Sequence, residues 1–232
     1  MAPIAFVCAM PMELRPLTKR LGLRPTRLGD GPGREGSLDG RDVVAIVTGM
    51  GTELAAAGMA RLLDAVTPER VVVVGITGAV EDETPIGALV LPERVVDGAS
   101  GREHRHELLG PGTTHGVMWT TDRITPADEL PALRAQGVVS LDMETAAIAR
   151  ACEEREVPWT VFRAISDRAT DGSVDEEVFR LSNQDGTPNP RAVARYVLRH
   201  PGRLSGMVRM GKGAKLATER AAEAAIAAVR AG

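Results

Sequence analysis

The sequence predicts a single α/β domain, with a central mixed, mostly parallel β-sheet flanked by helices. Short apolar runs alternate along the chain with longer segments whose apolar residues recur at helical spacing, as is typical of this class. The run Val71–Val74 consists of valines, as in strands buried on both faces of a parallel sheet. The 232 residues, 44% hydrophobic and 25% charged, match the length and composition of one globular domain.

The elements follow one another in a regular order. Apolar spacing separates helices from strands, and an alanine-rich segment after Thr52 favours a helix that this residue caps. In order, we predict a strand at 3–8, a helix from Met12, a strand at 42–48, a helix at 54–66, strands at 70–75 and 89–96, a strand at 137–140, a helix at 146–155 and a strand at 159–165. A short helix at 175–181, a breaker-rich segment at 183–190 and helices at 191–200 and 212–230 complete the chain.

Basic residues concentrate near the C-terminus. Residues 191–230 hold nine Arg and Lys against two Glu, whereas the whole chain has a net charge of -3. A cationic helix pair can bind nucleic acid or an anionic membrane, but Tyr196 is the one aromatic residue in this range, so base stacking and bilayer anchoring have little support. We therefore expect no nucleic-acid or membrane partner. We interpret residues 190–232 as an extra helical extension of a domain core at about 3–182.

Several classes of protein are excluded or disfavoured. The longest dense apolar run, 71–80, is shorter than the roughly 20 residues that a helix needs to span a bilayer, and the N-terminus lacks the pattern of a secretory signal, so we expect a cytoplasmic protein. Cys8 and Cys152 lie in apolar stretches and are predicted to be buried free thiols.

Three histidines fall in the irregular segment 97–115, which we interpret as a loop or lid over a site. His104, His106 and His115 have no suitable cysteine nearby. We therefore predict surface or lid histidines and no metal site.

Four predicted strands end in polar or glycine-rich segments, and ligands of open α/β sheets bind beyond the carboxyl ends of strands. Glu13 would lie in the first turn of a helix, where the helix dipole favours a negative charge. A first glycine loop at 48–52 and a second at 75–78 would expose backbone N–H groups to an oxyanion, a phosphate or a ribose hydroxyl. Taken singly, each segment also has an ordinary structural interpretation, as a helix cap or a tight turn.

Three further carboxylates follow predicted strands. Asp142 and Glu144 are two residues apart and cannot share a helix face, so we expect at most one of them in the crevice, and Asp142 can equally be an N-cap. Asp167 follows an apolar strand. Partial desolvation there would raise the pKa of its carboxyl and suit a general acid.

These segments together resemble the purine nucleoside phosphorylase and uridine phosphorylase superfamily, and within it the branch of methylthioadenosine/S-adenosylhomocysteine nucleosidases. The resemblance rests on Ala9–Glu13, on Leu141–Cys152 and on Val157–Asp167, which follow the family order together with both glycine loops. It covers about residues 3–182.

The resemblance implies a role for each carboxylate in cleaving an N-ribosidic bond, for which one group protonates the leaving base and another directs the nucleophile. Asp167 would protonate the purine at N7, and Ser166 would orient Asp167. Glu13 would orient and deprotonate water, and Glu144 would accept hydrogen bonds from ribose hydroxyls, with Met143 packed on the sugar. The remaining substrate-binding residues that it implies are Gly51, Ile76, Thr77 and Ile124, the last or Thr125 standing where the nucleosidases stack an aromatic residue on the base.

The nucleophile can be water or phosphate. Family phosphorylases carry an Arg before the second glycine loop and a Ser within it, and Val73 and Ile76 stand at those places here. A phosphate would thus lose two donors, and Glu13 would repel it. The donors that remain are Thr48, Thr52, Thr77, Arg15, Arg20 and Arg163.

We therefore predict a nucleosidase that hydrolyses the N-glycosidic bond of a purine nucleoside or a 5′-modified (thio)adenosine-type nucleoside. It is expected to need no metal or organic cofactor and to form a homo-oligomer, with a dimer favoured. A phosphate-dependent phosphorylase of the same fold is the first alternative. The second is a non-catalytic nucleoside-binding protein, against which the joint presence of Glu13, Glu144 and Asp167 argues.

Overall fold

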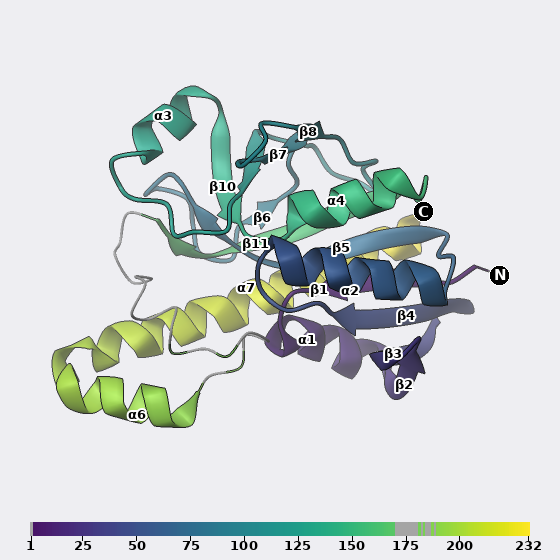
Figure 1. Cartoon of the computed structure of the whole chain (residues 1–232), viewed down its shortest axis with the longest axis horizontal. Helices are drawn as coiled ribbons and strands as arrows, with labels where there is room; N and C mark the ends of the chain where they lie inside the picture. Colours follow the sequence, from purple (N-terminus) through teal and green to yellow (C-terminus); the bar gives the residue numbers. More distant parts are fainter. Residues whose placement is uncertain (1, 170–180, 182, 184–186, 188) are drawn as a thin grey trace.

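One mixed sheet runs through the centre of the molecule with helices on both of its faces (Figure 1). The computed structural model describes residues 2–169, 181, 183, 187 and 189–232. The predicted helix at 175–181 falls outside the described residues except for Leu181. The predicted α/β class is confirmed.

The centre of the sheet is parallel and carries the predicted strands. β1 (Ile4–Cys8) pairs with β4 (Arg41–Val47) and with β5 (Arg70–Ala79), and β5 pairs with β11 (Trp159–Arg168), all in parallel. Their carboxyl ends therefore meet at one edge of the sheet. The other strands are β2 (Arg24–Leu28), β3 (Gly31–Leu38), β6 (Leu89–Val90), β7 (Arg94–Asp97), β8 (Glu103–His104), β9 (Val117–Thr120) and β10 (Val138–Asp142). The strand order is β2-β3-β4-β1-β5-β10-β9-β7-β8, with β11 between β5 and β6.

Two helical layers cover the sheet, because successive side chains of a strand point to opposite faces. From β1, Ile4 and Phe6 pack in one core cluster with α1 (Pro11–Leu21) and α7 (Leu204–Ala231). Ala5 and Val7 pack in the other cluster with α2 (Thr52–Ala65) and α4 (Thr145–Glu154). The shorter helices are α3 (Leu130–Ala135), α6 (Pro190–Arg199) and a 3-10 turn at Pro201–Arg203. No helix in the described part of the chain is both long and apolar enough to cross a membrane.

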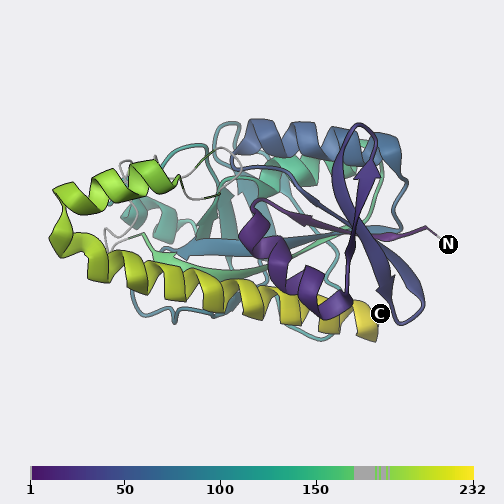
Figure 2. The same ribbon diagram turned by 90° about the horizontal axis from the view of Figure 1, so that it is seen from below.

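The basic C-terminal segment is only partly an extension. α6 and the first half of α7 project from the body as a hairpin (Figure 2). The second half of α7 belongs to the core, where Ala217, Ala221 and Ala225 are fully buried against the sheet. Alanine side chains let the helix approach the strands closely, so the core continues to Val229 instead of ending near residue 182.

Two histidines of the predicted lid at 97–115, His104 and His106, lie at the end of the sheet opposite to Asp167. His104 is buried and its Nδ1 lies 3.0 Å from a carboxylate oxygen of Glu153, while the ring of His106 packs against Trp159. Trp159 begins β11, so this contact lies at the end of the strand opposite to Asp167. The prediction of surface or lid histidines is therefore wrong for His104 and His106. Within the described ranges no group of three His, Cys, Asp or Glu is placed to hold a metal ion, and both cysteines are free and buried, as predicted.

Candidate active site

Glu13 bridges the ends of two strands. It lies in the first turn of α1, which starts with Pro11 directly after β1, and its side chain is completely buried. One carboxylate oxygen accepts hydrogen bonds from the backbone N–H groups of Ala9 and Met10, at 2.8 and 2.9 Å. The other accepts from the N–H of Ile76 at the end of β5, at 2.8 Å. Glu13 therefore caps its own helix and is also held facing the second glycine loop.

Arg163 gathers three carboxylates around one guanidinium. Its Nη2 lies 2.8 Å from Oδ2 of Asp142 and 3.2 Å from Oε2 of Glu144, and its Nη1 lies 3.6 Å from Oε1 of Glu13. Nη1 also donates to the carbonyl of Ile76 at 2.9 Å. All four charged side chains are buried. We call Glu13, Asp142, Glu144 and Arg163 the carboxylate cluster.

The reversed direction of β10 brings its two carboxylates to this cluster. β10 pairs antiparallel to the end of β5, with Leu141 opposite Gly78, so the residues after Leu141 run back along β5. Oδ2 of Asp142 accepts from the N–H of Thr145 at 2.9 Å, which caps α4, and Oε1 of Glu144 accepts from the N–H of Gly51 at 3.0 Å. Both side chains therefore contact Arg163, although we expected at most one of them in the crevice.

Asp167 lies beside this cluster, at the end of β11. The Ser166 hydroxyl donates to Oδ1 of Asp167 and also lies 3.4 Å from the carbonyl of Thr77. The Thr77 hydroxyl in turn donates to the carbonyl of Leu141 at 2.7 Å, which joins β5 to β10. A cavity of ≈ 120 Å³, here named the Asp167 cavity, opens at this point. Its lining includes Gly78, Ile124, Thr125, Asp142, Met143 and Asp167.

Burial dominates the electrostatics of the carboxylate cluster. It raises the pKa of Glu13, against the opposing effects of Arg163 and of three backbone N–H groups. Burial also raises the pKa of Glu144 to about 7; Arg163 opposes this shift, and the neighbouring Asp142 and Glu13 charges add to it. Burial acts to lower the pKa of Arg163, but the three carboxylates outweigh it and raise that pKa above its ordinary value. Arg163 is thus a permanent cation beside two carboxylates, Glu13 and Glu144, that accept protons more readily than usual.

In each glycine loop, one backbone N–H group donates a hydrogen bond to a carboxylate of the protein. Gly51 donates to Glu144 and Ile76 donates to Glu13, whereas we expected these loops to offer donors to an oxyanion or a ribose hydroxyl. Thr52 is the first residue of α2 instead of its cap, and its N–H and hydroxyl both donate to Asp122, at 2.8 and 2.6 Å.

Two parts of the site escaped the sequence reasoning. The first is the role of Arg163 as the centre of three carboxylates, since we considered it only as a phosphate ligand. The second is the close approach at Gly75, which we considered only as part of the second glycine loop: a Cβ atom there would lie 2.3 Å from Oε1 of Glu13 and 2.8 Å from Nη1 of Arg163. Its position directly after the valine run was the available signal. A side chain at residue 75 would displace the cluster.

Comparisons with known proteins identify the family of this chain. The sequence model of the phosphorylase superfamily matches residues 3–113 and 105–199. The chain is 29% identical over 195 residues to a 5′-methylthioadenosine/S-adenosylhomocysteine nucleosidase of Haemophilus influenzae strain PittEE, covering 71% of this chain and 85% of that protein. It is 30% identical over 202 residues to the nucleosidase of the same name from Chromohalobacter salexigens, covering 73% and 86%.

Solved structures share the whole fold. The nucleosidase of Neisseria meningitidis in complex with methylthio-immucillin-A superposes with a TM-score of 0.74 at 17% identity, covering 99% of both chains. Futalosine hydrolase of Helicobacter pylori strain 26695 gives 0.74 at 15% identity, covering 99% of this chain and 97% of that one. The matched residues and the sequence relatives show that this chain belongs to the phosphorylase superfamily and is similar to its 5′-methylthioadenosine/S-adenosylhomocysteine nucleosidases.

Proposed function

We propose that this chain is a nucleosidase that hydrolyses the N-glycosidic bond of a purine nucleoside or a 5′-modified (thio)adenosine-type nucleoside. The carboxylate cluster carries the proposal, because two of its three buried carboxylates, Glu13 and Glu144, contact one arginine beside a cavity that holds a further carboxyl group, Asp167. Cleaving an N-ribosidic bond needs a proton donor for the base and a group that directs the nucleophile to the sugar.

Each carboxyl group has a place in this reaction. Asp167 would protonate the leaving purine, and the Ser166 hydroxyl, which donates to it, would orient it. Glu13 would hold and deprotonate the attacking water, since its carboxylate is fixed by three backbone N–H groups. Glu144 would accept hydrogen bonds from the ribose hydroxyls. Met143 and Ile124, which line the Asp167 cavity, would contact the sugar and the base.

The charge of the cluster supports water over phosphate as the nucleophile. A phosphate dianion would meet three carboxylates and one guanidinium that is already bound to them. The threonine hydroxyls that remained as possible donors are engaged within the protein: Thr77 donates to Leu141 and Thr52 to Asp122. Water has no charge to be repelled and needs only an acceptor such as Glu13. The sequence relatives are themselves named as nucleosidases, which agrees with this choice.

Release of free base tests the proposal. Adenosine, inosine, methylthioadenosine and S-adenosylhomocysteine would be incubated with the protein in phosphate-free buffer and again with inorganic phosphate. The proposal expects release of base from at least one nucleoside without phosphate, and no stimulation by phosphate. Release that requires phosphate would make the protein a phosphorylase. Binding of a nucleoside without release under either condition would make it a nucleoside-binding protein.

The proposal extends to the assembly and location of the protein. We expect a cytoplasmic homodimer that requires no metal or organic cofactor and binds neither nucleic acid nor membrane. Light scattering would measure the oligomeric state, and turnover after exhaustive treatment with a chelator would test the absence of a metal requirement.

A further inference from the structure

Strand β11 carries an extra residue immediately before Asp167. Ile165 is opposite Thr77 of β5 and Asp167 is opposite Gly78, so Ser166 stands between them with no residue opposite it on β5. An insertion of this kind is a β-bulge, which shifts the alternation of the side chains that follow it and often re-aims one of them at an active site. The direction of the Asp167 carboxyl therefore depends on the conformation of the bulge at Ser166.

The buried Ser166 contacts both Asp167 and the long C-terminal helix. Its hydroxyl donates to Oδ1 of Asp167 and lies 3.4 Å from the carbonyl of Thr77. Its own carbonyl lies against α7, where a Cβ atom at Gly213 would be 2.6 Å from the carbonyl oxygen. Ser166 thus connects the Asp167 carboxyl with the backbone of α7.

Gly213 makes this close approach of helix and strand possible. Even weak Cα–H···O hydrogen bonds keep carbon and oxygen about 3.3–3.6 Å apart, so any side chain at residue 213 would push the helix and the Ser166 carbonyl away from each other. The same Cβ would also lie 3.2 Å from Cγ2 of Ile86. A glycine inside a helix costs stability relative to alanine. The contact with Ser166 gives Gly213 a reason, whereas a Cβ at Gly211 would meet no atom within 4 Å.

A second contact fixes α7 against the same end of β11. Leu216, one turn after Gly213, packs on Gly87, because a Cβ atom at residue 87 would lie 3.0 Å from Cγ of Leu216. The N–H of Gly87 donates to the carbonyl of Ile165 at 2.7 Å, and the N–H of Ile165 donates to the carbonyl of Ala88 at 2.9 Å. Helix α7 therefore packs both on the bulge itself and on the segment that is hydrogen-bonded to the residue before it.

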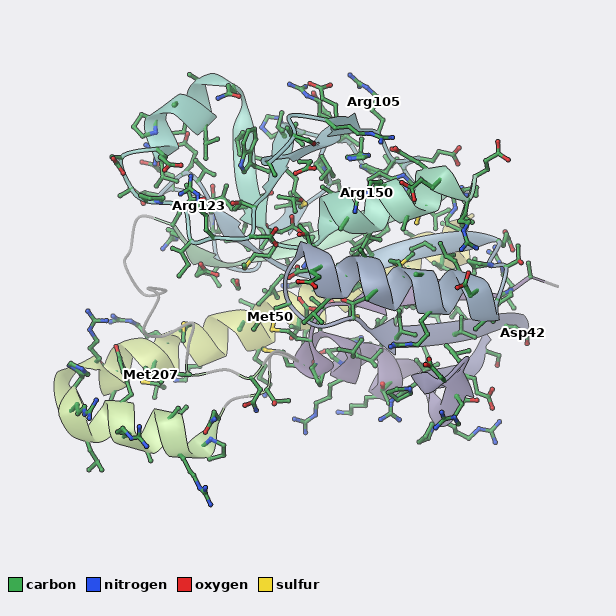
Figure 3. All side chains as sticks on the ribbon, in the orientation of Figure 1. Asp42, Met50, Arg105, Arg123, Arg150 and Met207 are labelled. Carbon is green, nitrogen blue, oxygen red and sulfur yellow. The ribbon has the colours of Figure 1, made fainter. Side chains whose placement is uncertain are left out.

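Gly213 lies where α7 passes from the projecting hairpin into the body of the domain. Met207 belongs to the projecting half of the helix (Figure 3), whereas Ala217 is fully buried against the sheet. Residues four apart lie on one face of a helix, so Gly213 begins the row of small residues that Ala217, Ala221 and Ala225 continue. This row therefore begins at the end of β11.

We propose that Gly213 is a positioning residue for Asp167. The inference rests on the proposed function, in which Asp167 protonates the leaving base. Because residue 213 has no side chain, α7 packs directly on the Ser166 carbonyl, and this contact fixes the bulge that directs the Asp167 carboxyl into its cavity. A general acid must lie within hydrogen-bond reach of the atom that it protonates, and a displacement of about 1 Å can cost roughly 10²-fold in rate. Gly213 is absent from the described lining of the Asp167 cavity, so it acts through Ser166.

Gly213→Ala, with Gly211→Ala as its matched control, tests the proposal. Base release from a nucleoside that the wild-type protein cleaves would be measured in single turnovers without phosphate, and equilibrium binding of the same nucleoside on the same preparations. We expect Gly213→Ala to lower the rate constant of base release by roughly 10-fold to 10²-fold and to change the dissociation constant by less than about threefold. Gly211→Ala adds its methyl group in open space on the same helix and should match the wild-type protein in both measurements.

A double-mutant cycle with Asp167→Asn separates positioning of the acid from general damage to the site. If Gly213 acts through Asp167, little remains for Gly213→Ala to disturb once the acid is gone. The double variant should then release base within about twofold of the rate of Asp167→Asn alone. Damage that reaches the site by another route would multiply with the loss of the acid. Thermal unfolding of all four proteins would monitor the fold.

Leu216→Ala provides a second variant in case Gly213→Ala does not fold. Leu216 is 45% exposed, so its truncation removes the packing on Gly87 with a limited loss of buried apolar surface. Leu198→Ala, at an exposed leucine of α6, is the control. We expect Leu216→Ala to slow base release by about threefold or more while Asp167 is present, and to have no such effect in Asp167→Asn.

Several outcomes would overturn the inference and leave the proposed function standing. A wild-type rate of base release in Gly213→Ala would do so, as would a loss of rate that is matched by an equal loss of binding or that multiplies with Asp167→Asn. If Gly213→Ala does not fold, a wild-type rate in Leu216→Ala would overturn it. Failure of the proposed function is distinct, because then the wild-type protein itself would release no base without phosphate.

Discussion

The Arg163 guanidinium lies 3.6 Å from the Glu13 carboxylate, and both side chains are buried in the core of the domain. Residue 163 is in β11 and residue 13 is in α1. This contact therefore joins two elements of the candidate site that lie far apart in the sequence. Asp142 and Glu144 complete the same cluster from β10 and the turn before α4. Burying three carboxylates costs free energy, and the buried Arg163 guanidinium offsets this cost. The site thus depends on Arg163.

Replacing Arg163 with methionine should destabilise the protein strongly. The substitution leaves three carboxylates buried without a counter-charge, and removing one partner of a buried ion pair costs about 3–5 kcal/mol. Urea unfolding at pH 8 would measure the loss in the free energy of unfolding. Arg20→Met removes an exposed pair with Glu219 and should cost no more than about 1 kcal/mol. Similar losses for both variants would contradict the central place of Arg163.

Gly75→Ala should lower kcat by at least about tenfold while the protein stays folded. A Cβ at residue 75 would lie 2.3 Å from Oε1 of Glu13, so the carboxylate must move, and small displacements of a positioned group reduce its effect on the reaction. Gly211→Ala on α7 is the control, because its Cβ would meet no atom within 4 Å. Wild-type kcat in Gly75→Ala would mean that the position of Glu13 does not matter to turnover.

The pH profile of kcat/KM should rise through about pH 7. Glu144 has a pKa of about 7, and its ionised carboxylate accepts hydrogen bonds from two ribose hydroxyls more strongly than the protonated acid, one of whose oxygens carries a proton. Lowering the pH protonates it, so kcat/KM should fall up to tenfold per pH unit below 7 and level off above it. Glu144→Gln should have a lower kcat/KM and lose the rise near pH 7, whereas Glu154→Gln, at the exposed end of α4, should keep the wild-type profile. An unchanged rise in Glu144→Gln would assign the titration to another group.

Asp167→Asn should reduce kcat by about 10²–10⁴-fold without unfolding the protein, because an amide cannot donate the proton that a general acid supplies. Single-turnover kinetics with a nucleoside substrate would measure the loss, and thermal unfolding would show that the fold is retained. Asp128→Asn, an exposed change in the segment before α3, serves as the control. Normal turnover by Asp167→Asn would remove the acid assignment.

Glu13→Gln should impair hydrolysis much more than binding. The amide cannot deprotonate water, but its oxygen can still accept hydrogen bonds from the N–H groups of Ala9 and Met10, which hold the side chain in place. Equilibrium binding of a nucleoside and kcat would be measured on the same preparation. A variant that keeps wild-type kcat would show that another group activates the water.

Alternation of strands and helices was enough to predict the α/β class. The position of carboxylates after strands marked Glu13, Asp142, Glu144 and Asp167 as candidates, and the resemblance to the nucleosidases separated Glu13, Glu144 and Asp167 from ordinary helix caps. The reversal of β10 could not be predicted, because nothing local in the sequence indicates whether a strand runs parallel or antiparallel to its neighbour. That reversal is the reason why Asp142 and Glu144 both contact Arg163.

Two other differences have local causes. The β2–β3 hairpin is built from proline, glycine and charged residues, so its strands carry too few apolar side chains to show a period of two. The second half of α7 was assigned to a charged extension because its basic residues are prominent in the sequence. The alanines between them, such as Ala221 and Ala225, form the stripe that packs on the sheet.

The most direct test of the account is the fate of oxygen during turnover. A nucleoside substrate would be converted in ¹⁸O-labelled water that also contains inorganic phosphate, and the sugar product would be examined by mass spectrometry. The account predicts a free sugar that carries one ¹⁸O atom at its anomeric carbon. An unlabelled sugar 1-phosphate would contradict it and would show that phosphate, despite the carboxylates around Arg163, is the nucleophile.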